Sequence, residues 1–118
     1  MAYVDGFLLT VATEKLEAYR KMSTDACAIW MEHGALDYKE CVIDDDHIEG
    51  VRPFAEAADA KEGETVVFSF IVYASREHRD EVNKKVMADP RLAETCTDQK
   101  LFDCKRMAYG GFKAIVEA

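Results

Sequence analysis

Hydrophobic and polar residues are arranged along this chain in blocks that predict strands and helices in turn. Residues Tyr3–Val11 are dense in aromatic and β-branched side chains, as is typical of a strand. Across Leu16–Trp30 the apolar residues recur at steps of three and four, which predicts an amphipathic helix. Thr13 is the expected N-cap of this helix, and Gly34 is its expected C-terminal stop. Strand character returns over residues 36–43.

The second half of the chain repeats this plan. Glu64–Tyr73 is the clearest strand of the sequence, and Ser75 is placed to cap a second helix after it. Asp89–Pro90 should end that helix, because a residue before proline avoids the α region, and the same pair can begin a short helix. Lys105–Val116 reads as the last strand, in which Gly110–Gly111 predicts a bulge or a close backbone approach.

The order of these elements predicts one α+β domain over residues 1–118. It is β-α-β-β-α-β, the ferredoxin-like plan, with an antiparallel sheet that carries two helices on one face. The least regular stretch is 44–63, rich in Asp, Glu, Ala and Gly, where one helical turn could follow Pro53.

The two faces of the central strand predict how the bare side of the sheet is covered. We expect the wholly apolar set to face the helices: Val66, Phe68, Phe70 and Val72. The other set mixes apolar residues with hydroxyls: Thr65, Val67, Ser69, Ile71 and Tyr73. A face in contact with water should be mostly charged, and neither set carries a charge. We therefore expect a second copy to cover the bare face, giving a homodimer of the dimeric α+β-barrel type.

Charge and composition exclude several classes of partner. The formal net charge of the 118 residues is -8, and the basic residues form pairs such as Lys84–Lys85 rather than clusters. Binding to nucleic acid or to an anionic membrane is therefore not expected. The sequence has neither an apolar run of membrane-spanning length nor a basic leader, which favours the cytoplasm. In that compartment the four cysteines should be free thiols, with a Cys96–Cys104 bridge as the alternative.

Three stretches of the chain resemble the YbaA-like family, a bacterial domain of unknown function. They are YVDGF at Tyr3–Phe7, ETVVFSFIVYASREHRDEVNKKVMADPR at Glu64–Arg91 and KRMAYGGF at Lys105–Phe112. The resemblance covers nearly the whole chain and implies membership of the dimeric α+β-barrel superfamily. Relatives in that superfamily include small monooxygenases, lactone isomerases and haem-handling proteins. The resemblance implies a fold and a dimer but assigns no reaction.

A pocket in such a fold would lie between the sheet and its cover, so inward polar residues are the candidates. We expect Asp5 on the first strand to pair with Arg106 on the last strand. This pair is either a clamp for an anion or enolate, or a structural ion pair at the rim. The candidate pocket residues are Tyr3, Asp5, Ser69, Tyr73, Arg106 and Tyr109.

Other polar residues each have a structural and a functional interpretation. If Tyr38 and Glu40 face inward, Glu40 could be a general base; otherwise they belong to a solvated strand. Cys41 is expected to be a small buried residue, and Arg79 and Asn83 to lie on a solvated helix face. His33 should lie at a helix C-terminus and His78 in the core, while His47 and the aspartates before it read as a solvated loop. The histidines lack zinc-site spacing and no nucleotide-binding motif occurs, so no metal or cofactor is expected.

Two functions remain open. The first is an uncharacterised protein that binds a small molecule in the barrel pocket and could be a cofactor-free monooxygenase- or isomerase-like enzyme. The second is a non-catalytic interaction or stress-associated homodimer whose interior is filled by side chains. The two functions can be distinguished by the interior of the protein, because only the first requires a cavity of several hundred Å³.

Overall fold

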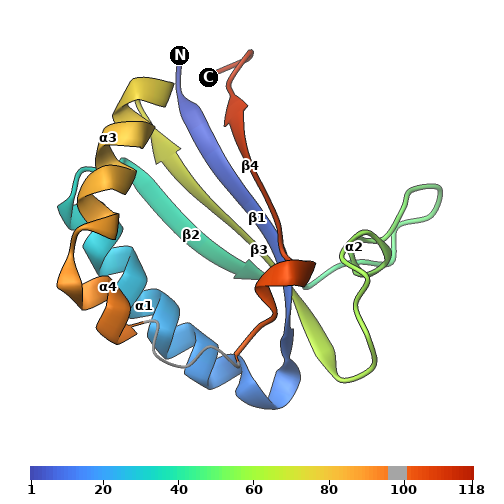
Figure 1. Ribbon diagram of the computed structural model, residues 1–118. Coiled ribbons are helices and arrows are strands. Elements are labelled where there is room, and N and C mark those ends of the chain that lie inside the picture. The colour runs from blue at the N-terminus through green and yellow to red at the C-terminus, as the bar shows by residue number, and fades with distance from the viewer. Residues whose placement is uncertain (96–100) are drawn as a thin grey trace.

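The computed structural model describes residues 1–95 and 101–118 and has the predicted ferredoxin-like α+β fold (Figure 1). Cys96, and with it the predicted alternative of a Cys96–Cys104 bridge, lies outside the described residues. The strands are β1 (Tyr3–Ala12), β2 (Asp37–Val42), β3 (Glu64–Tyr73) and β4 (Ala108–Lys113). The helices are α1 (Leu16–Glu32), α2 (Phe54–Ala57), α3 (Arg76–Met87) and α4 (Pro90–Thr95). Short 3-10 turns occupy Thr13–Lys15 and Cys104–Arg106. None of the helices among the described residues is long and apolar enough to cross a membrane.

The four strands form one antiparallel sheet in the order β2-β3-β1-β4. The two longest strands, β1 and β3, lie at its centre and pair along their whole length, from Tyr3 opposite Tyr73 to Ala12 opposite Glu64. Helices α1, α3 and α4 lie on one side of the sheet, and α2 with its flanking loops extends beyond the other side (Figure 1). The sheet therefore has one helix-covered face and one open face.

Helix α1 begins later than the sequence predicts. Thr13 is not its N-cap, because a 3-10 turn precedes the helix and the Thr13 hydroxyl bonds instead to that of Thr65 at 2.8 Å. The predicted stop is confirmed: Gly34 has a φ of 113°, and the amide of Ala35 reaches back to the carbonyl of Trp30.

The second helix and the turn after it follow the predicted capping chemistry. The Ser75 hydroxyl accepts a hydrogen bond from the amide of His78, as an N-cap does. Val82 and Val86 are buried against the sheet, and the helix ends just before Asp89–Pro90. Asp89 then accepts from the amide of Arg91 and starts α4.

The assignment of faces on β3 is the reverse of the prediction. The odd-numbered residues, including Ser69 and Tyr73, are buried under the helices, while Phe68 is 45% exposed on the open face. Both sets are apolar, so alternation alone cannot distinguish the two faces. The hydroxyls lie on the helix side, where Ser69 lines a cavity and Tyr73 bonds to Asn83, and the all-apolar set lies on the open face.

The irregular stretch 44–63 contains the expected helical turn after Pro53. Both carboxylate oxygens of Asp46 accept hydrogen bonds from the first amides of α2, those of Phe54 and Ala55, at 2.7 and 3.0 Å. The ring of Phe54 packs against Phe68 with centroids 6.1 Å apart, so α2 covers one end of the open face.

The two glycines of β4 mark a close approach and not a bulge. Pairing with β1 runs without a break from Tyr3 opposite Lys113 to Leu8 opposite Ala108. The strand is also shorter than predicted, since residues 104–106 form a 3-10 turn. A Cβ atom at Gly111 would lie 2.4 Å from the hydroxyl and 2.8 Å from the ring of Tyr3, whereas one at Gly110 would meet only Phe112 at 3.6 Å.

Gly111→Ala is therefore expected to lower the free energy of unfolding by about 1–3 kcal/mol, the usual cost of overpacking. Gly110→Ala is the matched control and should change it by less than about 0.5 kcal/mol. Urea denaturation of the two variants beside the wild type makes the comparison. Equal stability of the two variants would show that the Tyr3 ring does not constrain this strand.

Candidate functional site

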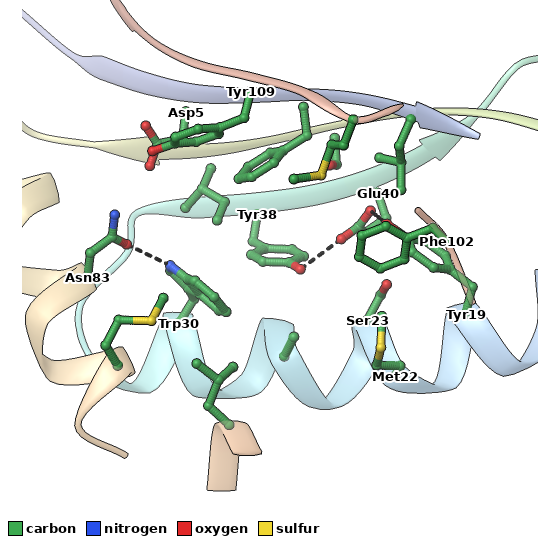
Figure 2. A pocket seen from close by; sticks show the side chains of 18 residues that line it. Asp5, Tyr19, Met22, Ser23, Trp30, Tyr38, Glu40, Asn83, Phe102 and Tyr109 are labelled. Carbon is green, nitrogen blue, oxygen red and sulfur yellow. Dashed lines mark hydrogen bonds between the residues drawn. The ribbon is translucent and has the colours of Figure 1, made fainter. Parts of the chain in front are cut away.

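A cavity of about 380 Å³ lies between the helix-covered face of the sheet and helices α1, α3 and α4 (Figure 2). Its walls are mostly apolar or aromatic. They are formed by Phe7, Leu9, Met22, Ala26, Trp30, Ile71, Met87, Leu92, Phe102 and Met107. This volume is within the range of small-molecule sites, and such sites typically combine apolar walls with a few placed polar groups.

Glu40 of β2 is the centre of the first polar group. Its Oε1 accepts a hydrogen bond from the Tyr19 hydroxyl at 2.7 Å, and its Oε2 accepts one from the Tyr38 hydroxyl at 2.8 Å (Figure 2). Burial raises the pKa of both tyrosines far above the ordinary value, and the charge of Glu40 raises them further. Both hydroxyls therefore keep their protons, and each donates a hydrogen bond to the carboxylate.

Asn83 of α3 forms the second polar group. Its Oδ1 accepts a hydrogen bond from the indole nitrogen of Trp30 at 3.1 Å and another from the Tyr73 hydroxyl at 3.3 Å. Trp30 can only donate, so these contacts fix which end of the amide is oxygen. In Figure 2 the amide nitrogen points away from Trp30, and Asn83 lines the cavity.

The third polar group is a buried ion pair between the sheet and α3. Asp5 is 1% exposed, and its Oδ1 accepts from Arg79 Nη1 at 2.7 Å. The same guanidinium donates to Asp80 and to the Tyr109 hydroxyl, at 2.7 and 3.0 Å, and stands 4.9 Å over the ring of Tyr3. Because a buried carboxylate is costly without a cation, Arg79 is what permits a charge at this depth.

The structure brings five of the six predicted pocket residues to this region. Asp5, Ser69 and Tyr109 line the cavity. Tyr3 lies under the Arg79 guanidinium, and Tyr73 is fully buried with its hydroxyl on Asn83.

The sixth residue, Arg106, lies elsewhere, and the predicted Asp5–Arg106 pair is wrong. Arg106 donates two hydrogen bonds of 2.8 Å to Glu64 and another to the carbonyl of Asp59. It lies in the turn before β4, beyond the pairing of Leu8 with Ala108, whereas Asp5 pairs with Gly111 further along the strand. The register of β4 on β1 therefore places Arg106 several residues along the strand from Asp5.

The sequence interpretation missed several residues of the site. Arg79 and Asn83 were expected on a solvated helix face, but Arg79 reaches Asp5 and Asn83 lines the cavity. Tyr19, Met22 and Trp30 follow the helical stripe and are cavity walls as well as core. Glu40 was not missed, because it was a candidate base on condition that it and Tyr38 face inward, and both line the cavity.

The remaining candidates have structural roles. His33 lies at the C-terminus of α1 and contacts Asp89 at 2.8 Å, while Nδ1 of His78 accepts from the amide of Ala74. Cys41 is exposed and not buried as expected, because β2 is an edge strand and Cys41 lies beside Phe68 on the open face. No three His, Cys, Asp or Glu side chains within residues 1–95 and 101–118 are grouped as metal ligands would be.

Comparison with known proteins places the chain in a family. Residues 2–104 match the family described as "Protein of unknown function (DUF1428)". The chain is 45% identical over 117 residues to the uncharacterised protein YbaA of Escherichia coli strain K12, covering 99% of both chains.

Solved structures with the same fold include a NIPSNAP family protein from Agrobacterium tumefaciens. It has a TM-score of 0.61 and 16% identity, and the match covers 96% of this chain and 92% of that one. A putative antibiotic biosynthesis monooxygenase from Nitrosomonas europaea has a TM-score of 0.54 and 13% identity, over 97% and 90% of the two chains. At these identities the likeness concerns the fold alone.

The protein is thus a single-sheet ferredoxin-like α+β protein with a cavity under its helices. It belongs to the DUF1428 family, which includes YbaA.

The ion pair of Glu64 with Arg106 predicts a pH dependence of stability. The hydrogen bonds from Arg106 lower the pKa of Glu64 to about 2 from 4.5. A carboxyl whose pKa is lower in the folded state stabilises the fold above its unfolded pKa, and this contribution is lost as the pH falls through the folded value. Glu64→Gln should therefore be less stable than the wild type at pH 7, and the difference should shrink between about pH 4.5 and pH 2.

Urea denaturation at several pH values measures this effect. Glu17→Gln is the control, because Glu17 is exposed and contacts Arg20 only at 3.7 Å. A constant difference between Glu64→Gln and wild type across the acid range would contradict the pairing.

Proposed function

We propose that this protein binds a small, largely apolar molecule in the cavity between its sheet and helices, and that it does so as a homodimer. The observation that carries the proposal is the cavity of about 380 Å³ with aromatic and aliphatic walls and three polar groups. A protein whose interior served only for packing would fill this space with side chains, because protein cores tolerate few voids.

A cofactor-free reaction is the next step of the proposal. The carboxyl group of Glu40 lies at the cavity wall and is the candidate general base for a proton from an enolisable or phenolic ligand. The shared fold of the putative monooxygenase from Nitrosomonas europaea is an analogy in the same direction. A non-catalytic interaction dimer is the alternative, and the open cavity is the feature that argues against it.

The binding proposal predicts that a larger side chain in the cavity weakens the binding of a ligand. Ala26 is a buried wall residue at the middle of α1, so Ala26→Leu should fill part of the space. Binding of an uncharged solvent-sensitive naphthalene dye, followed by its fluorescence, should weaken by about tenfold or more. Ala18→Leu, at an exposed position of the same helix, is the control and should bind as the wild type does. Equal dye binding by the two variants would contradict the site.

The dimer proposal rests on the open face of the sheet. Most of its side chains are apolar, with Phe68 at 45% and Phe112 at 62% exposure, and Val4, Leu8, Phe70 and Val72 line the same hollow. The edge strand β2 adds two charged residues to this face, Asp37 and Lys39, which pair with each other at 2.9 Å. Two strands of ten residues and two of six form a face of roughly 500 Å². This is of the same order as the roughly 800 Å² that each partner contributes to a stable interface. A second copy offers an equally apolar and equally large face, so a two-fold pair covers both.

We expect the wild type to sediment as a dimer at micromolar concentration and Phe68→Glu to sediment as a monomer, because the charge would be buried without a partner. Met31→Glu introduces the same charge on α1, at a residue 42% exposed on the other side of the molecule, and should remain dimeric. A monomeric wild type would overturn the pairing.

A further inference from the structure

The direction of the hydrogen bonds at the Glu40 end of the cavity restricts what a ligand can offer there. A tyrosine hydroxyl has one hydrogen, and both Tyr19 and Tyr38 donate theirs to Glu40. The carboxylate has no hydrogen to give. All three groups therefore present only lone pairs, so a ligand group that bonds to any of these three must be a donor.

The Asn83 end has the opposite polarity. Two donors occupy its oxygen, so the remaining capacity of the amide is the pair of hydrogens on Nδ2. Within the described part of the chain the structure gives Nδ2 no hydrogen-bond acceptor. A ligand group that bonds to Asn83 must therefore be an acceptor, such as a carbonyl oxygen.

The charges of the walls exclude an anionic ligand. The described lining residues include two carboxylates, Asp5 and Glu40, and no lysine, arginine or histidine. Arg79 forms ion pairs with both Asp5 and Asp80, so its charge is already balanced by two carboxylates. Glu40 is stabilised by the two hydroxyls and needs no cation, so an uncharged donor is sufficient.

Resting on the binding function proposed above, we infer that the ligand is an uncharged aromatic compound with a hydroxyl group at one end and a carbonyl at the other. The hydroxyl donates to the Glu40 cluster, and the carbonyl accepts from Asn83 Nδ2. The rings lie between Trp30, Phe7 and the methionines of the wall. The cavity thus selects its ligand by the direction of two hydrogen bonds.

A matched set of naphthalenes tests this inference by isothermal titration with the full-length protein. The reference probe is 6-acetyl-2-naphthol. Its methyl ether lacks the donor, 6-ethyl-2-naphthol lacks the carbonyl, and 6-hydroxy-2-naphthoate carries a negative charge. The methyl ether and the ethyl compound each lose one hydrogen bond, and the naphthoate brings a negative charge beside Asp5 and Glu40 without a cation on the wall. Each analogue should therefore bind about tenfold more weakly or worse than the reference. Tighter binding of the methyl ether or of the naphthoate would overturn the inference.

Two near-isosteric variants assign the hydrogen bonds to residues. Glu40→Gln adds hydrogens at the donor-selecting end, so the preference for the naphthol over its methyl ether should fall to less than about threefold, while the preference for the carbonyl remains. Asn83→Asp keeps the oxygen that Trp30 and Tyr73 need and removes the free hydrogens, so it should abolish only the preference for the carbonyl. A change of both preferences in either variant would show a general loss of packing and would overturn the assignment.

The outcomes distinguish this inference from the function on which it rests. Equal binding of all four compounds and of the purely apolar 2-ethylnaphthalene would overturn the hydrogen-bond selection while supporting a binding cavity. Binding of none of the five would overturn both. Thermal unfolding of each variant, followed by circular dichroism, verifies that the fold is kept.

Discussion

The buried carboxylate of Asp5 is the constraint on which the arrangement of sheet and helices depends. A charge on a central strand, 1% exposed, is tolerated only beside a cation, and Arg79 of α3 supplies it at 2.7 Å. The contact fixes where α3 lies over β1. It also holds the hydroxyl of Tyr109 and the ring of Tyr3 in place, and Tyr3 in turn requires a glycine at position 111.

The position of α3 then determines the cavity. Asn83 lies one helical turn beyond Arg79, which brings its amide to Trp30 of α1 and Tyr73 of β3. At the far end Glu40 of β2 joins the same sheet to α1 through Tyr19. Each of the three polar groups thus joins the sheet to a helix. The sheet and helices are held at a fixed separation, and the apolar space between them is left for a ligand.

The sequence predicted the elements well because their signals are local. The cap at Ser75, the stop at Gly34 and the break at Asp89–Pro90 each depend on a few adjacent residues, and the structure has them. The faces of β3 were reversed because both sets of side chains are apolar, and only docking of the helices decides between them.

The site was less predictable because it depends on contacts distant in the chain. Asp5 was singled out correctly as a charge needing a partner, but its partner is 74 positions away on a helix. The spacing of Arg79 and Asn83 indicates only that they share a helix surface, not that this surface meets a cavity. Arg106 was misplaced because the composition of the last strand does not reveal its register on β1, which puts Gly111 opposite Asp5.

The central claim is that the space under the helices is a ligand site, and the methionines of the chain allow it to be tested directly. Met22, Met87 and Met107 line the cavity, although Met87 is also 64% exposed, while Met1 and Met31 do not line it. Carbon-13 labelling of the methionine methyl groups gives one NMR signal for each of the five, and an uncharged naphthalene is then titrated into the sample. We predict saturable shifts of the three cavity methyls and none of the other two. Shifts confined to Met1 and Met31, or no saturable shift at any methyl, would contradict the account.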